Sequence, residues 1–581
     1  MSSANAPGAV GLESYSYSLP ADLEKAIGEA RKKWDESGNT ERLWKKDASL
    51  WTNTDESKWL GWLDIVGQEL GSVSRFKALQ AEIREDGFRH VVLLGMGGSS
   101  LCPEVFSKTF GQQPDSPELL VLDSTDPLQI RALRQRIDPA RTLFCVSSKS
   151  GTTLEPNIYM QYFYAETKKL VGDRAGHHFI AVTDPGSKLE GVSKQLGFRG
   201  LFHGVPSIGG RYSALSDFGL IPHSAMGLDT ERLLRHTAAM VEACKTPNAA
   251  KNPGVALGLF LGTAAVKFRR DKVTLICSRS VCDLGAWLEQ LLAESTGKQG
   301  KGLIPVDREP LFDPDQYGKD RVFAYITYAG DTDTEKENAV GKLEKAGAPV
   351  VRIVLNDLYD IGQTFFQWEI ATAVAGAVIG INAFNQPDVE ASKIATRDLT
   401  SEFEKTGSLP SEEPILDQDG IKLFTDKANA EALVNGGTTL GAVIRRHVDR
   451  IKPGDYFGLL AYIPMFPEYE ATLEKIRKEI VESKQVATVL GFGPRFLHST
   501  GQAYKGGPNS GVFLQITCEE SEDLQVPDQK YTFGVVKAAQ ARGDFQVLAE
   551  RRRRALRVHL GKDLAKGLDQ LADLICAALA H

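Results

Sequence analysis

Short apolar segments alternate with longer stretches of mixed polarity along the middle of the chain. Between residues 90 and 206 the apolar segments cover residues 90–94, 119–122, 142–146, 179–182 and 201–205. This alternation is typical of parallel strands connected by helices that cover both faces of a sheet. A second series at residues 273–277, 322–328 and 350–355 predicts a second sheet. The apolar run of residues 253–268 between the two series predicts a long helix.

The two ends of the chain differ from this central part. Residues up to about 85 have a helical pattern and contain five of the seven tryptophans, Trp34, Trp44, Trp51, Trp59 and Trp62, which we expect to pack this segment onto the body. Residues 456–463, 486–492 and 512–516 are further strand candidates, followed by a helical pattern. The sequence therefore predicts an α/β protein with a helical N-terminal cap (1–85), a first α/β domain (86–245), a second (246–440) and a C-terminal α/β extension (441–581).

Two loops rich in small and hydroxyl residues follow two of the predicted strands. They read Gly95-Met96-Gly97-Gly98-Ser99-Ser100 and Ser147-Ser148-Lys149-Ser150-Gly151-Thr152-Thr153. Small residues after a strand let backbone N–H groups and hydroxyls converge on an anion, and a helix that begins just beyond adds its positive end. The first loop, with Gly98 and Ser99, fits a ligand contact and a purely structural turn equally well. The second favours phosphate binding by Ser148, Lys149, Ser150, Thr152 and Thr153. Neither loop has Walker spacing, and no acidic residue is placed to bind a ribose.

Composition limits the partners that the protein can have. The chain has 581 residues, 42% of them hydrophobic, and a formal net charge of -7, so we expect no binding to nucleic acid and local attraction of any anionic ligand. The run Arg551-Arg552-Arg553-Arg554 is interpreted as a solvated helix face. The seven cysteines have no Cys-x-x-Cys pair and are interpreted as buried thiols in a reducing cytosol. With no leader pattern at residues 1–7 and no long apolar run, we expect a cytoplasmic protein without membrane contact.

Three further segments occur in a specific order along the chain. They are Ile208-Gly209-Gly210-Arg211-Tyr212-Ser213, Ala293-Glu294-Ser295-Thr296-Gly297-Lys298 and Phe384-Asn385-Gln386-Pro387-Asp388-Val389-Glu390-Ala391-Ser392-Lys393. Together with the two loops, they resemble the glucose-6-phosphate isomerase (phosphoglucose isomerase) family over about residues 85–400. Within that family the chain is most similar to the isomerase half of bifunctional transaldolase/phosphoglucose isomerase proteins. The resemblance implies two doubly wound parallel sheets of the sugar-isomerase type.

The resemblance also implies an activity and roles for single residues. It implies an aldose–ketose isomerase of glycolysis and gluconeogenesis that interconverts glucose 6-phosphate and fructose 6-phosphate through a cis-enediol, without cofactor or metal, as a homodimer. Such chemistry needs a base for the C–H proton, a cation for the enediolate oxygen and an acid–base group for the sugar ring. The resemblance assigns these roles to Glu294, Arg211 and Lys393, and assigns phosphate contact to Gln386. Arg211 could instead pin a turn, and Lys393 could form a helix-face pair with Glu390.

The ring-opening histidine of the family pattern has a different place in the order of this chain. In the family, a ring-opening histidine lies between the glutamate and the lysine, often in a Leu-His-Ser-x-Gly-Gln segment, and reaches the site from the neighbouring subunit. This chain has no histidine between His236 and His447, and the segment Leu497-His498-Ser499-Thr500-Gly501-Gln502 follows Lys393 instead. We predict that His498 opens the ring; the alternative is a loop histidine without a catalytic role. Asp388 is a second departure, because the family commonly has Gly or Ala there.

Two other functions remain open at this stage. The chain could isomerise another hexose phosphate, such as mannose 6-phosphate, because the shape of the pocket around C2 is not readable from sequence. A non-catalytic phosphosugar-sensing protein could use the same loops, but it would have no use for Arg211, Glu294 and Lys393 together. In each case the expected partner is a small sugar phosphate.

Overall fold

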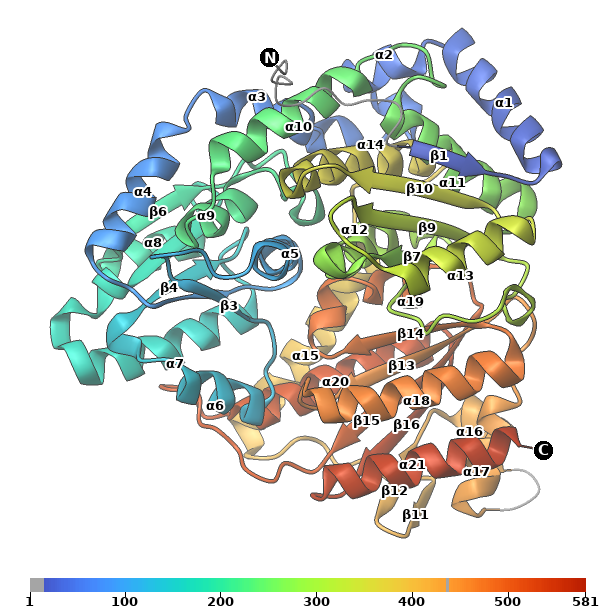
Figure 1. Ribbon diagram of the computed structural model, residues 1–581. Coiled ribbons are helices and arrows are strands. Elements are labelled where there is room, and N and C mark those ends of the chain that lie inside the picture. Colours follow the sequence, from blue (N-terminus) through green and yellow to red (C-terminus); the bar gives the residue numbers. More distant parts are fainter. Residues whose placement is uncertain (1–14, 435–437, 581) are drawn as a thin grey trace.

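Three sheets surrounded by helices make up the protein (Figure 1). The computed structural model describes residues 15–434 and 438–580. In Figure 1 the first sheet lies at the left, the second at the upper right and the third at the lower right. Residues 1–14 lie outside the described residues. The predictions about a leader and about the start of the helical cap fall on them. Within residues 15–434 and 438–580, no helix is long and apolar enough to span a membrane.

The first sheet has five parallel strands in the order β3-β2-β4-β5-β6. The five predicted segments are confirmed as β2 (His90–Leu94), β3 (Glu118–Leu122), β4 (Thr142–Ser147), β5 (Phe179–Thr183) and β6 (Gly200–His203). Every residue of β4 and β5 is buried, as expected for strands of a sheet covered on both faces. The helices of this part are α5 (Leu101–Phe110), α6 (Pro127–Arg136), α7 (Leu154–Val171), α8 (Lys188–Gln195), α9 (Asp217–Ala225) and α10 (Thr230–Cys244).

The second sheet has the order β1-β10-β9-β7-β8. Its parallel strands are β7 (Lys272–Cys277), β8 (Ile304–Asp307), β9 (Arg321–Tyr328) and β10 (Val350–Leu355), and β1 (Tyr15–Ser18) pairs antiparallel with β10 at the edge. The expectation of a wholly helical N-terminal segment was therefore wrong at β1, where alternating Tyr and Ser suit a half-buried edge strand. The predicted helix of residues 253–268 is confirmed as α11 (Pro253–Phe268), followed by α12 (Leu284–Thr296), α13 (Thr334–Lys345), α14 (Ile361–Ile379) and α15 (Pro387–Thr406).

The third sheet has six strands in the order β11-β12-β16-β15-β13-β14. They are β11 (Leu416–Gln418), β12 (Ile421–Phe424), β13 (Tyr456–Tyr462), β14 (Ala487–Phe492), β15 (Gly511–Cys518) and β16 (Arg554–Leu560). Strands β13 to β16 run parallel, and β12 pairs with β16, so residues 416–424 belong to this sheet although the sequence placed them before a boundary at 440. The helices are α16 (Lys427–Val434), α17 (Leu440–Val448), α18 (Pro467–Lys484), α19 (Gly501–Gly506), α20 (Phe533–Glu550) and α21 (Leu564–Leu579).

The tryptophans of the N-terminal cap attach it to the body, as predicted. The cap contains α1 (Ala21–Glu36), α2 (Asn39–Trp44), α3 (Trp62–Leu70) and α4 (Ser74–Glu85). The indole N–H of Trp51 donates to the carbonyl of Ala373 in α14 (2.8 Å), and the fully buried Trp62 stacks on Tyr212 with ring centroids 5.1 Å apart. A large buried aromatic surface with a satisfied N–H therefore fixes the cap on the helices that surround the site.

Two interpretations of the sequence need correction. Helix α20 ends before the arginine run, where Arg552 has φ +54°, and the buried Arg553 donates to the carbonyl of Gly507 (2.8 Å). The run is therefore a turn and the start of β16, not a solvated helix face, because Arg551, Arg553 and Arg554 find acceptors within the fold. Cysteines 102, 145, 244 and 277 are buried as expected, but Cys282 is exposed and cysteines 518 and 576 are half-buried.

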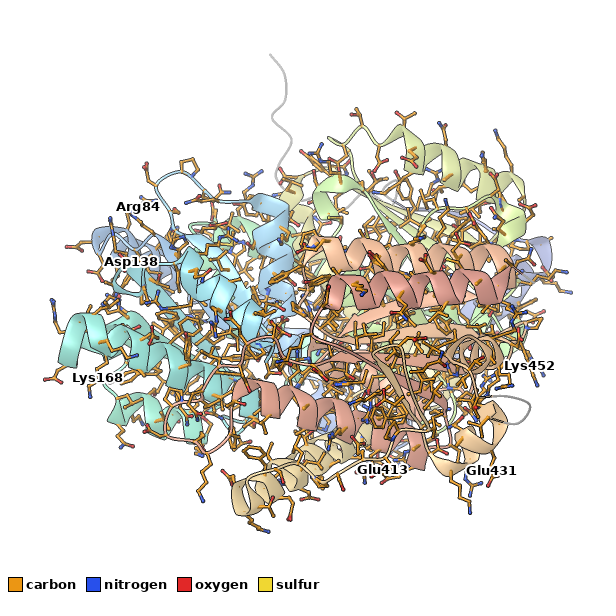
Figure 2. The ribbon with its side chains drawn as sticks, turned by 90° about the horizontal axis from the view of Figure 1, so that it is seen from below. Arg84, Asp138, Lys168, Glu413, Glu431 and Lys452 are labelled. Carbon is orange, nitrogen blue, oxygen red and sulfur yellow. The ribbon has the colours of Figure 1, made fainter. Side chains whose placement is uncertain are left out.

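Charged side chains that do face solvent lie at the periphery. Figure 2 shows the labelled residues Arg84, Asp138 and Lys168 at the left of the molecule, and Glu413, Glu431 and Lys452 toward the lower right. All six are exposed. Charged side chains of both signs are usual at a protein surface. The candidate site described below uses charged side chains that are buried instead.

The contact between α11 and α14 gives a test of the packing. A Cβ added at Gly258 would lie 2.5 Å from the carbonyl oxygen of Ala371 and 2.6 Å from Cβ of Val374. We expect Gly258→Ala to lower the free energy of unfolding by about 1–3 kcal/mol through overpacking. The matched change Gly28→Ala, at an exposed position of α1 with no atom within 4 Å, should raise it by about 0.5–1 kcal/mol. Urea titration measures both, and equal stability of the two variants would contradict the packing described.

Candidate active site

The first glycine loop is used for close packing of the site. After β2 the chain forms the turn η4 (Gly97–Ser99), in which Gly97 has φ +54°. A Cβ at Gly98 would lie 2.0 Å from the carbonyl oxygen of Gly210, and one at Gly97 would lie 2.5 Å from that of His498. Glycine is therefore required for this loop to contact two other predicted site segments. Ser99 is buried in the same turn.

Arg211 is a buried guanidinium with almost all of its donors committed. It lies in the turn η7 (Gly210–Tyr212), is 2% exposed, and its Nη1 is 3.7 Å from Oε1 of Glu294. Four of its five N–H groups donate to protein acceptors, namely Ser295 Oγ (2.7 Å), Gln386 Oε1 (3.0 Å), Ala383 O (2.8 Å) and Asn385 O (3.1 Å). One Nη1–H is left over for a ligand oxygen, because guanidinium carries five N–H donors in a fixed plane.

Helix α12 presents Glu294 together with a glutamine that the sequence analysis missed. Gln290 lies four residues before Glu294, which places the two on one helix face. Its Nε2 donates to Oε2 of Glu294 (3.0 Å) and to the carbonyl oxygen of His498 (2.9 Å). Oε1 of Glu294 is thereby left as the oxygen without a hydrogen bond to Gln290. The position of Gln290, four residues before Glu294 in a predicted helix, was a signal that could have identified it.

His498 pairs with a buried carboxylate, Glu155, that the sequence analysis also missed. Nε2 of His498 lies 2.9 Å from Oε1 of Glu155, which also accepts from Nε2 of Gln540 (2.6 Å). Burial raises the pKa of Glu155, but the charge and hydrogen bond of His498 outweigh it, so this pKa lies below its ordinary value. Since a carboxylate only accepts hydrogen bonds, Nε2 of His498 carries a hydrogen and Nδ1 remains as the proton acceptor of the neutral ring.

The same chain supplies His498, through the turn η11 (Arg495–His498) that follows β14 of the third sheet. Arg495 holds this turn on the first domain by ion pairs with Glu104 and with Asp123 (3.2 Å). Full burial lowers the pKa of Arg495 to about 10. This turn brings His498 next to Gln290 of the same chain, although His498 follows Lys393 in the sequence.

The second loop places its hydroxyl groups at the start of α7. Ser148 Oγ donates to Thr153 Oγ1 (3.2 Å), and Ser150 Oγ lies 2.9 Å from Thr152 Oγ1. Thr153 is the N-terminal boundary residue of α7, which has 18 residues, so an anion here would also meet the positive end of a long helix. The structure departs from the prediction at Lys149, whose ammonium binds Asp184 and the carbonyl of Val205 (3.3 Å). A carboxylate at the end of the neighbouring strand attracts this lysine more closely than the loop does.

A cavity of about 800 Å³ joins the second loop to the third sheet. Its lining includes Ser150, Thr152, Thr153, Lys393 and His498. Lys393 lies on α15 with 48% of its side chain exposed, and its Nζ is 3.9 Å from Oε2 of Glu390. Gln386 is the residue before α15. Glu294 and Arg211 do not line this cavity; Gln290 connects Glu294 to the backbone of His498 at its wall. Within residues 15–434 and 438–580, no group of three or more His, Cys, Asp or Glu side chains is arranged to hold a metal ion.

Part of the chain is similar to known proteins. Residues 81–303 match the family model described as phosphoglucose isomerase. The chain is 26% identical over 430 residues to a glucose-6-phosphate isomerase of Carboxydothermus hydrogenoformans, covering 64% of this chain and 90% of that protein. It is 27% identical over 379 residues to a probable glucose-6-phosphate isomerase of Methanococcus maripaludis, covering 58% of this chain and 84% of that protein.

Solved structures show the same fold. A glucose-6-phosphate isomerase from Chlamydia trachomatis superposes with a TM-score of 0.53 at 21% identity, covering 68% of this chain and 90% of that chain. The matched segment of the family model contains both loops, Arg211 and Glu294, and the sheets and their connections follow the sugar-isomerase pattern expected from the sequence. Through residues 81–303, the chain is similar to the phosphoglucose isomerase family.

Proposed function

We propose that this protein is a glucose-6-phosphate isomerase that interconverts glucose 6-phosphate and fructose 6-phosphate by proton transfer through an enediol. The observation that carries the proposal is the convergence of Glu294, Arg211 and the His498–Glu155 pair beside a hydroxyl-rich loop at a helix N-terminus. A sensor of sugar phosphates needs the loop only. The carboxylate, guanidinium and imidazole add the groups that proton transfer between adjacent carbons requires.

Glu294 is suited to move the proton between C2 and C1. Gln290 binds Oε2 of Glu294, so Oε1 is the oxygen that takes the proton from C2 and returns it at C1. The charge that builds up on the enediolate oxygen is matched by the uncommitted Nη1–H of Arg211, whose nitrogen lies 3.7 Å from Oε1. Donors and carboxylate are held by buried hydrogen bonds before substrate arrives, which lowers the reorganisation needed during the reaction.

His498 and Lys393 are suited to open the sugar ring. The carboxylate of Glu155 orients the imidazole and stabilises its protonated form, so the ring can give a proton to the ring oxygen of the sugar and take one from a hydroxyl. Lys393 lines the same cavity and adds a cation near that oxygen. The phosphate then lies against Ser148, Ser150, Thr152 and Thr153, with Gln386 held by Arg211.

Oligomeric state and location are not needed for this assignment. The homodimer and the cytoplasmic location stay predictions from the sequence. Because one chain supplies Glu294, Arg211, Lys393 and His498, we infer that turnover does not require a residue from a second subunit.

An activity assay together with a substitution of the proposed base, Glu294, tests the proposed function. Wild-type protein should convert fructose 6-phosphate to glucose 6-phosphate in an assay coupled to glucose-6-phosphate dehydrogenase, with mannose 6-phosphate as the competing substrate. Glu294→Gln keeps the shape of the side chain and removes its basicity, so kcat should fall by about 10²- to 10⁴-fold. Binding of a sugar phosphate, measured by calorimetry, should persist. Near wild-type turnover of the variant would exclude Glu294 as the base, and an inactive wild type would exclude the function.

The Glu155–His498 pair gives a second prediction. Glu155→Gln keeps a hydrogen-bond acceptor for His498 but removes the charge that stabilises imidazolium, so kcat on cyclic substrate should fall by about 100-fold. Exchange of the C2 proton of a tetrose 4-phosphate, which has no free hydroxyl with which to close a ring, should be spared. Glu166→Gln, also on α7 but paired with Arg134 and Lys169 at the surface, is the matched control and should leave both rates unchanged.

Mixing of subunits tests whether the site is complete in one chain. His498→Ala and Glu294→Gln are each expected to be inactive on cyclic substrate. When the two are co-expressed or unfolded and refolded together, activity should not rise above the sum of the separate variants, because each chain lacks one group of its own site. Recovery of a large fraction of wild-type activity would show that His498 acts across a subunit boundary.

A further inference from the structure

The buried side chain of Gln502 lies at the point where three parts of the site meet. It belongs to the short helix α19, four residues after His498, and is 0% exposed. A Cβ at Gly297, the residue that follows α12, would lie 2.4 Å from Cα of Ala503, so α19 is in direct backbone contact with the end of the helix that carries Glu294.

All of the hydrogen-bonding capacity of Gln502 is directed at the two other helices of the site. Its Oε1 accepts from the backbone N–H groups of Asp388 (3.0 Å) and Val389 (3.3 Å), in the first turn of α15. Its Nε2 donates to the carbonyl oxygen of Gly297 (2.9 Å) and to Oδ2 of Asp388 (2.7 Å). One side-chain amide therefore caps the N-terminus of α15 and ties it to the end of α12.

Asp388, the residue that departs from the family pattern, completes the connection. Its side chain is 9% exposed, and its Oδ1 lies 2.6 Å from Nη2 of Arg551, at the turn after α20. The carboxylate is therefore shared between an amide donor from α19 and a guanidinium from the arginine run. Gln502, Asp388 and Arg551 together are called the α15 clamp below.

The geometry points to Gln502 as a positioning residue that sets Lys393, on α15, and Gln386, just before it, relative to Glu294 and His498. This inference rests on the proposed isomerase function. Gln386 lies two residues before Asp388, and Lys393 lies about one and a half turns after it, so a shift at the first turn of α15 moves both side chains. A displacement of about 1 Å in such an arrangement costs on the order of 100-fold in rate.

Gln502→Glu tests the clamp without changing the shape of the side chain. The glutamate keeps the oxygen that caps α15, but its second oxygen faces the carbonyl of Gly297 and the carboxylate of Asp388, both of which are acceptors. We expect kcat for fructose 6-phosphate, corrected for active folded protein, to fall about tenfold or more, with a rise in KM because Gln386 moves as well.

Asn252→Asp is the matched control. Asn252 is also fully buried, its Oδ1 caps a helix by accepting from the N–H of Val255 (3.0 Å), and its Nδ2 donates to the carbonyls of Cys244 (2.6 Å) and Thr246 (2.9 Å). It makes the same kind of connection between α10 and α11, which carry no predicted site residue. The control should lower the melting temperature at least as much as Gln502→Glu and leave kcat and KM within about twofold of wild type.

A second substitution should repair the first. In the double variant Gln502→Glu with Asp388→Asn, the side-chain amide introduced on α15 donates to the carboxylate introduced on α19. This removes the repulsion between the two carboxylates, and the repulsion by the carbonyl of Gly297 remains. The double variant should therefore be more active than Gln502→Glu alone, although Asp388→Asn by itself lowers activity through the loss of the Arg551 pair. Arg551→Gln, at a side chain that is 49% exposed and so tolerated by the fold, should give a smaller loss of kcat in the same direction.

The outcomes distinguish a failure of the α15 clamp from a failure of the proposed function on which it rests. An inactive wild type would overturn the proposed function. With an active wild type, a loss in Gln502→Glu that is no greater than in Asn252→Asp, or no recovery in the double variant, would overturn the clamp and leave the proposed function intact. A selective loss of kcat that Asp388→Asn partly restores would support it.

Discussion

The two hydrogen bonds of Gln290 join parts of the site that come from different sheets. One goes to Glu294 on α12, which follows the second sheet's first parallel strand, and the other goes to the backbone of His498, which follows β14 of the third sheet. The bond to His498 requires the η11 turn to approach α12 closely, and the same turn lies against the loop of the first sheet. Gly97 and Gly297 make this possible, since a Cβ at either position would overlap backbone of residues 498–503. The arrangement of the candidate site therefore depends on a contact between backbones.

All three sheets share one winding pattern, and this explains where the site residues lie. In each sheet the first parallel strand lies between the second and the third: β2 between β3 and β4, β7 between β8 and β9, and β13 between β14 and β15. Loops at the carboxyl ends of such strands are where α/β folds bind ligands. The first sheet contributes the hydroxyl-rich loop, and the third contributes His498 through β14. The helix after β7 carries Glu294.

Buried charges in this site are paired, which the net charge of -7 does not reveal. Arg211 is surrounded by acceptors, Glu155 by His498 and Gln540, and Arg495 by Glu104 and Asp123. An unpaired charge in these positions would cost several kcal/mol. Each pair also bridges elements that are distant in sequence. The contacts of Arg211 join the first domain to the second, and those of Glu155 and Arg495 join it to the third, while they orient the side chains of the candidate site.

The sequence by itself determined the features that depend on neighbouring residues. The alternation of apolar and polar positions predicted most of the strands and the helix of residues 253–268. The motif segments identified Arg211 and Glu294, which the structure brings within 3.7 Å of each other. The order of hydroxyl residues after β4 predicted a loop at the start of a helix. These properties follow from strand and helix periodicity and from turn chemistry, which act over a few residues.

Only the tertiary structure decided which distant side chains meet. It paired His498 with Glu155 and brought the pair to α12 within one chain, it turned Lys149 toward Asp184, and it folded the arginine run into a turn that reaches Asp388. It also moved residues 416–424 into the third sheet by pairing β12 with β16. No local pattern encodes these contacts, because each depends on which strand ends lie side by side. That order is set by the burial of whole sheets against their helices and not by the spacing of residues along the chain.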